Sequence, residues 1–495
     1  MRYRHDPEGE RLPVKIDSTS NGEYVPRPLS RDEQTIVDNA HAAASDNARR
    51  HGMARRPYMI SHMAAAATLK SINDVAAGNG RAGGFFDLPP EAGLDEDAAR
   101  SVLAGREFIF DVQNHAVDPD GAWRRAPGAD KMLAQARRIA GPRVSPHAAA
   151  ADEYAYLRLL DGDHYIKDIF VDSDTQLAAL SVHATHHEDE PMGMAESAML
   201  RTLVDRLGQG QRLLLHAKAL PNMPGELDRM RDMVETWGIA AWKLYPQLGP
   251  LPENRGYDLD DLSVMTPFIE QSRKLGIDIV CMHKGLPYVE TSYRQSTCRD
   301  VGSAARLFPD MKFLVYHGGY ELDRHEGAYD PDDAAAGINA LVKSLIDNGI
   351  APNSNVYAEL GGTWRILMRD PEQAAHAWGK LLRYVGEDNV LWGTDCMWSG
   401  SPQDQIMAFR AFQIAEDFAE RHGYPLLTDR IKAKIFGTNA AAVYGVDIPE
   451  VRKRTVADDV EQARAAEADR PDPSFATHGP TTSEEYSALR NMEKF

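Results

Sequence analysis

Eight short apolar runs in this chain are each followed by a residue that can bind a metal ion or exchange a proton. These residues are His115, His183, His216, Lys243, His283, His317, Glu359 and Asp395. Imidazole and carboxylate groups are common ligands of zinc, iron and manganese, and they also act as general acids and bases. One histidine after a strand is more often structural than functional. Several at corresponding positions, with an aspartate at the end of the series, favour a shared site.

The apolar runs themselves have the length and composition of buried β-strands. They cover residues 108–110, 177–182, 213–215, 239–242, 277–281, 313–316, 356–358 and 390–392. Segments long enough for helices separate most of them, and alternating strands and helices imply a parallel sheet. Eight such units predict an α/β protein with a closed (β/α)8 TIM barrel, whose active site lies at the carboxyl ends of the strands.

The segment around Asp395 has this arrangement in its clearest form. A short apolar run ends at Trp392, Gly393 permits a close turn, and Asp395 stands where the strand would end. The run from Ser401 to Asp404 then supplies a capping serine, a proline suited to the first helical position and an acid three residues after the serine. We expect a helix to follow, with an apolar stripe made of Ile406, Phe409, Phe412, Ile414 and Phe418.

Two extensions flank the predicted barrel, to which we assign residues 106–448. Residues 1–105 are polar, and we expect them to be partly helical and to wrap the barrel or pack on a second subunit. Nothing in this N-terminal extension predicts a chemical role. Within it, residues 83–90 contain two phenylalanines and two prolines and are expected to form a loop. Residues 449–495 are charged and weakly apolar, which is typical of a tail that covers a partner or stays mobile.

The composition excludes several classes of partner. The formal net charge of −19 over 495 residues argues against nucleic acid or an anionic membrane as the main partner. The three cysteines lack metal-type spacing and suit a reducing cytosol. Arg55-Arg56 and the alanine-rich run from Met63 to Leu69 have the outline of a twin-arginine export signal, but His62 and Lys70 bound a run too short for an apolar core. We predict a helix there and a cytoplasmic protein.

Four short motifs resemble those of the amidohydrolase superfamily. They are Met-His-Lys-Gly around His283, Tyr-His-Gly-Gly around His317, Gly-Thr-Asp ending at Asp395, and the closing run from Gly437 to Ala442. Their order and spacing are similar to those of the branch that contains aminocarboxymuconate-semialdehyde decarboxylase. The resemblance covers residues 107–446.

This resemblance implies a metal centre. In the superfamily the first strand carries His-x-His, the fifth and sixth strands each give a histidine, the eighth gives an aspartate, and binuclear members add a carboxylated lysine from the fourth. Residues at matching positions are His115, Lys243, His283, His317 and Asp395. Gln113 stands where the first histidine is expected, and an amide is a poorer zinc ligand than an imidazole.

Other residues could complete the site. Glu359 could terminate or bridge a metal ion, and His183, His187 and His216 are candidates as ligands or as supports for ligands. The run from His186 to Glu190 is, however, more typical of a solvated loop. Lys243 could be carboxylated, bind as a neutral amine, or remain a cation beside Asp395 or Glu359. The candidates for substrate binding are Arg365, which suits a carboxylate or phosphate, and the aromatic residues Trp398, Tyr288 and Tyr320.

The layout is also similar to non-haem diiron monooxygenases built on this fold, as in platensimycin-type diterpenoid biosynthesis. That resemblance implies two iron ions, O₂ as co-substrate, an electron donor, and hydroxylation of a lipophilic carboxylic acid or acyl-CoA. The iron ligands would be His115, Lys243, His283, His317, Glu359 and Asp395. We favour this interpretation and expect His317, Glu359 and Asp395 to be catalytic.

Two alternatives remain open. The first is a zinc- or manganese-dependent hydrolase or non-oxidative decarboxylase of a small carboxylic acid, in which Asp395 acts as base and His317 polarises or protonates the substrate. The second is a binding protein on a barrel that has lost its activity. The two extensions are compatible with a homodimer in each case.

Overall fold

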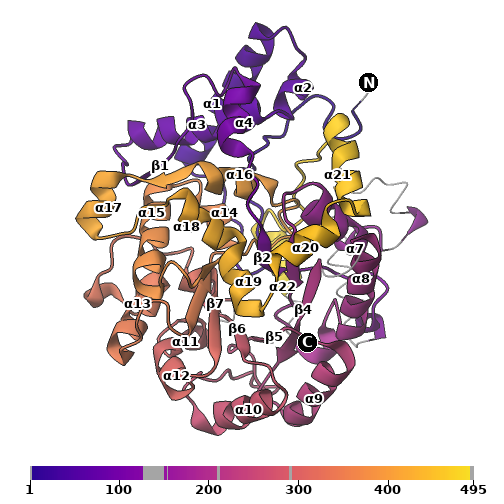
Figure 1. Cartoon of the computed structure of the whole chain (residues 1–495), viewed down its shortest axis with the longest axis vertical. Helices are drawn as coiled ribbons and strands as arrows, with labels where there is room; N and C mark the ends of the chain where they lie inside the picture. The colour runs from indigo at the N-terminus through magenta and orange to yellow at the C-terminus, as the bar shows by residue number, and fades with distance from the viewer. Residues whose placement is uncertain (1–2, 126–149, 153, 209–211, 289–291, 491–495) are drawn as a thin grey trace.

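Eight parallel strands form a barrel at the centre of the molecule (Figure 1). The computed structural model describes residues 3–125, 150–152, 154–208, 212–288 and 292–490. The strands are β2 (Phe110–Asn114), β3 (Leu177–Leu180), β4 (Leu213–Ala219), β5 (Ala241–Leu244), β6 (Ile279–His283), β7 (Lys312–Tyr316), β8 (Val356–Glu359) and β9 (Val390–Leu391). Each pairs in parallel with the next along the chain. All eight predicted strands are present.

Backbone hydrogen bonds between the first strand and the end of the last one close the ring. The amide of Val112 donates to the carbonyl of Trp392 at 2.9 Å, and the amide of His115 donates to the carbonyl of Cys396 at 2.8 Å. The predicted (β/α)8 barrel is therefore confirmed. This closure also brings the carboxyl ends of β2 and β9 side by side, which is where the site described below is assembled.

Helices in the connections between strands surround the barrel. The longer ones are α8 (Met194–Leu207), α9 (Glu226–Trp237), α10 (Leu262–Lys274), α13 (Gly337–Asn348), α15 (Pro371–Lys380) and α16 (Gln403–Ala411). In α13, Ile338, Leu341, Val342 and Leu345 recur at helical spacing and are buried in the main apolar core. Within the described residues no helix has the length and apolar character needed to cross a bilayer.

Shorter helices and helical turns fill the other connections. They are η1 (Ala122–Arg125), η3 (Leu157–Leu160), α7 (Gly162–Tyr165), η4 (Ile166–Val171), η5 (His187–Asp189), α11 (Tyr293–Ser296), α12 (Val301–Leu307), η7 (His317–Gly319), η8 (Pro331–Asp333), α14 (Thr363–Leu367), η9 (Leu381–Val385), α17 (Glu416–His422), α18 (Asp429–Ala433), η10 (Lys434–Thr438) and α19 (Asn439–Tyr444). The last two form the closing helical segment expected before Gly445.

The N-terminal extension contains helices that lie together at one end of the molecule (Figure 1, indigo). They are α1 (Arg31–Arg50), α2 (Arg55–Met59), α3 (His62–Gly78) and α4 (Glu96–Leu103). A capping box between Ser30 and Glu33 starts α1. The small buried side chains of Ala40, Ala44 and Ala48 let α1 pack closely on the alanine-rich α3. The helix expected in place of an export signal is thus confirmed.

Two expectations for the connecting segments are wrong. Residues Gly84–Phe86 form strand β1 rather than a loop, and this strand pairs antiparallel with β10 (Phe412–Ile414). The apolar stripe after Asp395 therefore does not continue as one helix, because α16 ends at Ala411 and Phe418 belongs to α17. The ring of Phe412 packs edge-on against that of Phe86, with centroids 5.8 Å apart. The strand pairing and this contact together stabilise an extended segment where the spacing of apolar residues predicts a helix.

Residues 448–490 fold back over the barrel and the N-terminal segment (Figure 1). They form α20 (Ile448–Thr455), α21 (Asp459–Asp469) and α22 (Ser483–Arg490). The fully buried Arg212 donates from Nε to Asp458 at 2.6 Å, which connects the start of β4 to the start of α21. Residues 472–480 then run beside the N-terminal segment, where the amide of Ser20 donates to the carbonyl of Pro480 at 2.9 Å. The tail expected to cover a partner or stay mobile instead covers its own chain in the described residues.

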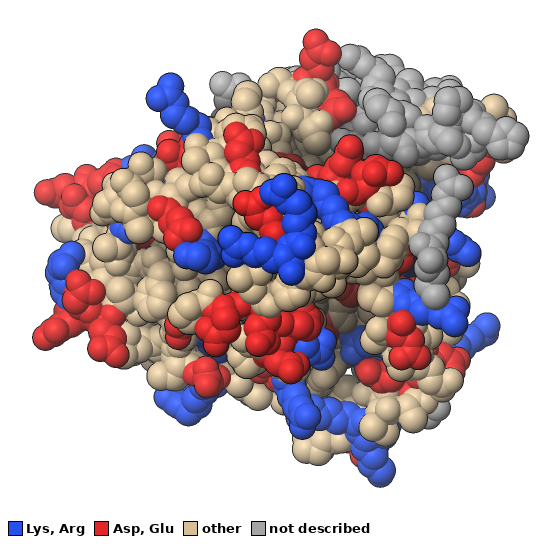
Figure 2. All heavy atoms as spheres, turned by 90° about the horizontal axis from the view of Figure 1, so that it is seen from above, with Lys and Arg blue, Asp and Glu red and all other residues tan. Residues whose placement is uncertain are grey.

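Acidic and basic side chains are interspersed over the face shown in Figure 2. Exposed ion pairs also occur on the surface, such as Arg273 with Asp310, which lie 2.6 Å apart. Such pairs contribute little to stability because water and salt screen them. The ion pairs that bear on the site are the buried ones.

Candidate functional site

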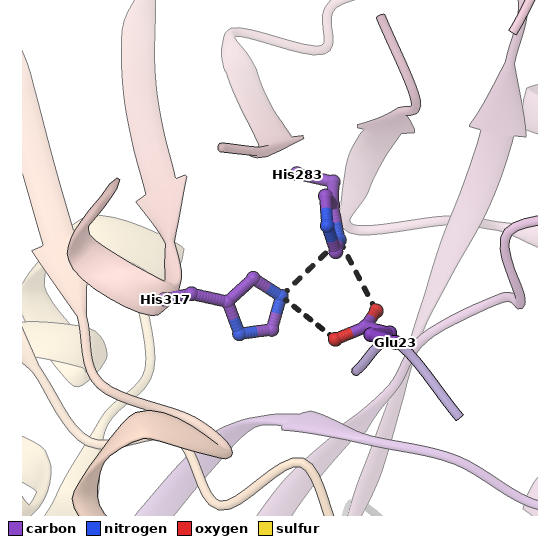
Figure 3. Close-up of side chains that lie close together, drawn as sticks. All are labelled: Glu23, His283 and His317. Carbon is purple, nitrogen blue, oxygen red and sulfur yellow. Dashed lines mark hydrogen bonds and ion pairs between the residues drawn. The ribbon is translucent and has the colours of Figure 1, made fainter. Parts of the chain in front are cut away.

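Two histidines from adjacent strands and a glutamate from the N-terminal extension converge at the carboxyl end of the barrel (Figure 3). His283 is the last residue of β6, and His317 directly follows β7. Nε2 of His317 lies 3.2 Å from Nδ1 of His283. The carboxylate oxygens of Glu23 lie 3.2 Å from Nδ1 of His283 and 3.5 Å from Nε2 of His317. Both imidazole rings are fully buried.

Backbone carbonyl groups determine the tautomers of both histidines. Nδ1 of His317 lies 2.8 Å from the carbonyl oxygen of Gly361, and Nε2 of His283 lies 3.2 Å from that of Leu286. A carbonyl oxygen can only accept, so in each neutral ring the nitrogen facing it carries the hydrogen. The nitrogens that face each other therefore carry lone pairs. Burial keeps the His317 ring neutral by lowering its pKa to about 4.

These three residues fit a metal ion because all of them present electron pairs to one point. Two nitrogen lone pairs and a carboxylate at these distances repel one another unless a proton or a cation lies between them. Their ligand atoms all lie within 4.8 Å of one another. That spacing is compatible with joint coordination of one ion at about 2.0–2.2 Å from each atom. Glu23, His283 and His317 would hold such an ion.

Asp395 lies beside this cluster, and hydrogen bonds stabilise its charge. Its Oδ1 accepts from Nε2 of Gln113 at 3.1 Å and faces Nε2 of His115 at 3.0 Å. Its Oδ2 accepts from the side-chain amide of Asn21. Burial favours the neutral acid, but the hydrogen bond and charge of His115 outweigh it and hold the pKa of Asp395 below its usual value. Asp395 is therefore an ionised proton acceptor.

Asn21 connects the cluster to Asp395. Its Nδ2 donates to Glu23 at 2.6 Å and also to Asp395. The N-terminal extension, in which no chemistry is visible from the sequence, therefore contributes two polar side chains to this cluster. No spacing rule relates Glu23 to two histidines more than 250 residues later. The local signal was a turn-forming Asn-Gly pair directly before an acid.

Left-handed backbone conformations aim two of these side chains. His317 has a φ of 62° and Asp395 a φ of 57°. A residue with a side chain adopts this conformation at a cost of about 1–3 kcal/mol, and such strain concentrates at functional sites. Gly318 continues the turn with a φ of 58°.

Glu359 supports this turn and is not part of the three-residue group. Its Oε1 accepts from the backbone amide of His317 at 2.8 Å, and its Oε2 accepts from that of Gly361. Burial raises the pKa of Glu359 to about 8. The predicted ligand is thus in contact with the site through the backbone that carries His317.

Lys243 and His216 lie inside the barrel next to tyrosine rings. Nζ of Lys243 lies 3.4 Å from the ring centroid of Tyr316, and it has no hydrogen-bond partner among the described residues. Burial lowers the pKa of Lys243 to about 8. The two nitrogens of His216 lie 3.0 Å from the hydroxyls of Tyr316 and Tyr444. The structure brings neither residue into the three-residue group.

The other two histidines predicted as ligands or supports, His183 and His187, pair with acidic residues. Nδ1 of His183 lies 2.9 Å from Glu190, and its ring centroid lies 5.1 Å from that of His115, so His183 borders the site. Nε2 of His187 lies 2.9 Å from Glu226 and belongs to a separate contact.

A small cleft lies beside Asp395, and several predicted substrate-binding residues are near it. Its lining includes Thr19, Asn21, Tyr24, Arg365, Asp395 and Trp398. Arg365 already donates to the carboxylate of Asp17 at 2.6 Å and to the carbonyl of Thr19 at 2.9 Å. Tyr288 packs edge-on against His283 with ring centroids 4.8 Å apart. Tyr320 is buried, and its carbonyl accepts from the amide of Leu286 at 2.7 Å.

Comparison with known proteins gives one family match. A family model described as Amidohydrolase matches residues 110–446. No curated protein matches the chain. Solved structures with a similar barrel include a dihydroxybenzoic acid decarboxylase from Polaromonas with bound manganese and the inhibitor 2-nitroresorcinol, at 15% identity and a TM-score of 0.42, covering 69% of this chain and 97% of that one.

Two further structures are similar at the same level. An uncharacterized TIM-barrel protein from Bordetella bronchiseptica has 14% identity and a TM-score of 0.40, covering 68% of this chain and 99% of that one. A 4-oxalomesaconate hydratase from Rhodopseudomonas palustris has 16% identity and a TM-score of 0.38, covering 73% of this chain and 99% of that one. The family assignment rests on the family model alone.

Proposed function

Because this chain belongs to the amidohydrolase family, we propose that it is a metal-dependent enzyme that hydrolyses or decarboxylates a small carboxylic acid without molecular oxygen. The observation that carries the proposal is the convergence of two histidine lone pairs and a carboxylate beside the ionised Asp395. A divalent cation bound there, such as zinc or manganese, would polarise a carbonyl or carboxylate oxygen of the substrate.

Asp395 is the proposed proton acceptor. His115, Gln113 and Asn21 fix its carboxylate, so little reorganisation is needed when it takes a proton. The cleft next to Asp395 has space for about one water molecule in this structure. Arg365 lines this cleft, and its buried Nε has no hydrogen-bond partner among the described residues, which leaves a donor for a substrate oxygen.

The diiron monooxygenase interpretation gains no support from these observations. Within the described residues a single group of three potential ligands converges. Both oxygens of Glu359 already accept from backbone amides, and Lys243 lies against a tyrosine ring. One ion without a redox role is the simpler account of this donor set.

The test combines metal content with turnover. Purified protein loaded with zinc or manganese is expected to hold about one ion per chain by mass spectrometry and to release CO₂ or a hydrolysis product equally with and without O₂. Asp395→Asn should lower kcat by at least about hundredfold, because it removes the proton acceptor but keeps the side-chain shape. About two irons per chain, with turnover that requires O₂, would contradict this proposal and support the diiron monooxygenase interpretation.

A further inference from the structure

We propose that residues 17–23 are a built-in part of the metal centre, in which Glu23 supplies the ligand that Gln113 cannot, and that residues 472–480 hold this segment in place. The inference rests on the proposed function, since it concerns the same metal centre. It assigns a binding role to both ends of the chain, which lie outside the matched residues 110–446.

Gln113 stands at the first-strand position where a histidine is expected, and its neutral amide is a weaker metal ligand than an imidazole or a carboxylate. Its Nε2 donates to Asp395 at 3.1 Å, and its buried Oε1 has no hydrogen-bond partner among the described residues. The nitrogen of this side chain therefore supports Asp395. The carboxylate of Glu23 faces both of these histidines. A carboxylate is a stronger ligand for zinc or manganese than a neutral amide.

Contacts from two arginines fasten the segment that carries Glu23. Arg365, 4% exposed, donates to the carboxylate of Asp17 at 2.6 Å and to the carbonyl of Thr19 at 2.9 Å. Arg369 donates to the carbonyl of Asp17 at 2.9 Å. Burial opposes the charge of Asp17, but the two arginines outweigh it and hold the pKa of Asp17 well below its usual value. The anchor is therefore ionised at neutral pH.

The C-terminal segment of residues 472–480 lies against the same stretch from the other side. The amide of Ser20 donates to the carbonyl of Pro480, and the hydroxyls of Thr19 and Thr477 lie 2.9 Å apart. The amide of Gly479 donates to the carbonyl of Trp398 at 2.9 Å. A Cβ atom at Gly479 would overlap the carbonyl oxygen of Ser20, so the approach requires glycine.

The affinity for the metal ion and the conformational order of residues 17–23 and 472–480 should therefore depend on each other. Without a cation, the carboxylate of Glu23 faces two nitrogen lone pairs, and the hydrogen bond from Asn21 together with the contacts of residues 17–20 holds it there. Weakening those contacts should lower metal affinity even though no ligand is changed. If metal affinity depends on these contacts, Glu23 is a positioned metal ligand. If it does not, Glu23 only lies near the histidines.

The first experiment measures the affinity of the full-length protein for Mn²⁺ and Zn²⁺ by calorimetry. Glu23→Gln should lower the affinity by at least about tenfold, the lower limit for even an indirect partner of a metal ligand. The double variant Glu23→Gln/Gln113→His should regain part of the lost metal affinity, because it places an imidazole on the first strand. Unchanged affinity in Glu23→Gln would overturn the inference.

The second experiment uses a variant that touches no ligand. Gly479→Ala should push Ser20 away and lower the affinity for Mn²⁺ by roughly three- to tenfold, less than the loss of a ligand support. Gly327→Ala is the matched control, because a Cβ there meets open space. Far-ultraviolet circular dichroism checks that each variant is folded. Equal affinities for Mn²⁺ in Gly479→Ala and Gly327→Ala would show that residues 472–480 do not contribute to metal binding.

The outcomes also separate this inference from the proposed function. A wild-type protein that binds neither ion contradicts both. A wild-type protein that binds one ion tightly, with Glu23→Gln and Gly479→Ala both unchanged, leaves the metal-dependent enzyme in place and rejects only the role of the chain ends.

Discussion

Backbone carbonyl groups decide what each histidine of this barrel presents to its neighbours. The carbonyls of Gly361 and Leu286 place hydrogens on the outer nitrogens of His317 and His283, and the inner nitrogens are left with lone pairs. His216 differs because tyrosine hydroxyls, which can donate or accept, face both of its nitrogens. The same side chain is thus a candidate ligand in one environment and a structural group in another, and the residue type alone does not distinguish them.

His216 allows the structural role to be tested through pH. Burial lowers its pKa from 6.5 to about 3, and the charge of Lys243 adds to this effect. Because the folded pKa lies below the unfolded one, the stabilisation is fully present above the unfolded pKa of 6.5 and is lost as the pH falls towards 3. His216→Gln keeps hydrogen-bonding ability but does not titrate. Its free energy of unfolding should therefore fall less steeply than that of the wild type in acid, where one pKa unit corresponds to about 1.4 kcal/mol.

Urea denaturation followed by circular dichroism at several pH values between about 7 and 4 measures this difference. Parallel pH dependences of the two proteins would show that His216 has the same pKa in the folded and unfolded states.

Turns at the strand ends orient the side chains that form the candidate site. After β7 the chain enters left-handed conformations at His317, Gly318 and Gly319, and the carboxylate of Glu359 binds the amide that begins this turn. The strand determines where the backbone of His317 lies, and the turn determines the direction in which its imidazole ring points. A substitution that alters the turn and leaves the strands unchanged should therefore weaken metal binding more than it disturbs folding.

Gly318→Ala tests this separation. Its φ of 58° disfavours a side chain, and a Cβ there would lie 2.9 Å from Leu360. The variant should lose about 1–2 kcal/mol of stability and also bind Mn²⁺ more weakly. Gly349→Ala, with a φ of 66° in open space, should lose similar stability but keep its metal affinity. Thermal unfolding and calorimetry measure the two effects, and equal metal affinity in both variants would mean that the turn does not position His317.

Across the whole molecule, what could be predicted from the sequence depends on whether the signal is local. The eight strands and the residues after them follow from alternation within short windows, and the barrel then brings their ends together. Glu23 and Asn21 reach the site through contacts between segments hundreds of residues apart, which no local pattern encodes. The pairing of β1 with β10 escaped prediction for the same reason. The barrel was therefore predictable, and the part of the site supplied from outside it was not.

The contact between the barrel and the C-terminal helices can be tested at Arg212. The side chains of Arg212 and Asp458 are both fully buried, and their pairing at 2.6 Å joins β4 to α21, upstream of residues 472–480. Arg212→Met leaves Asp458 as a buried, unpaired charge, which typically costs about 3–5 kcal/mol. If residues 472–480 depend on this contact, the variant should also exchange amide hydrogens faster around Ser20 and bind Mn²⁺ more weakly. Arg273→Ala, which breaks a half-exposed pair, should cost less than about 1 kcal/mol and change neither property. Faster exchange confined to α20 and α21, with the affinity for Mn²⁺ unchanged, would mean that the two ends of the chain reach the site independently of that buried pair.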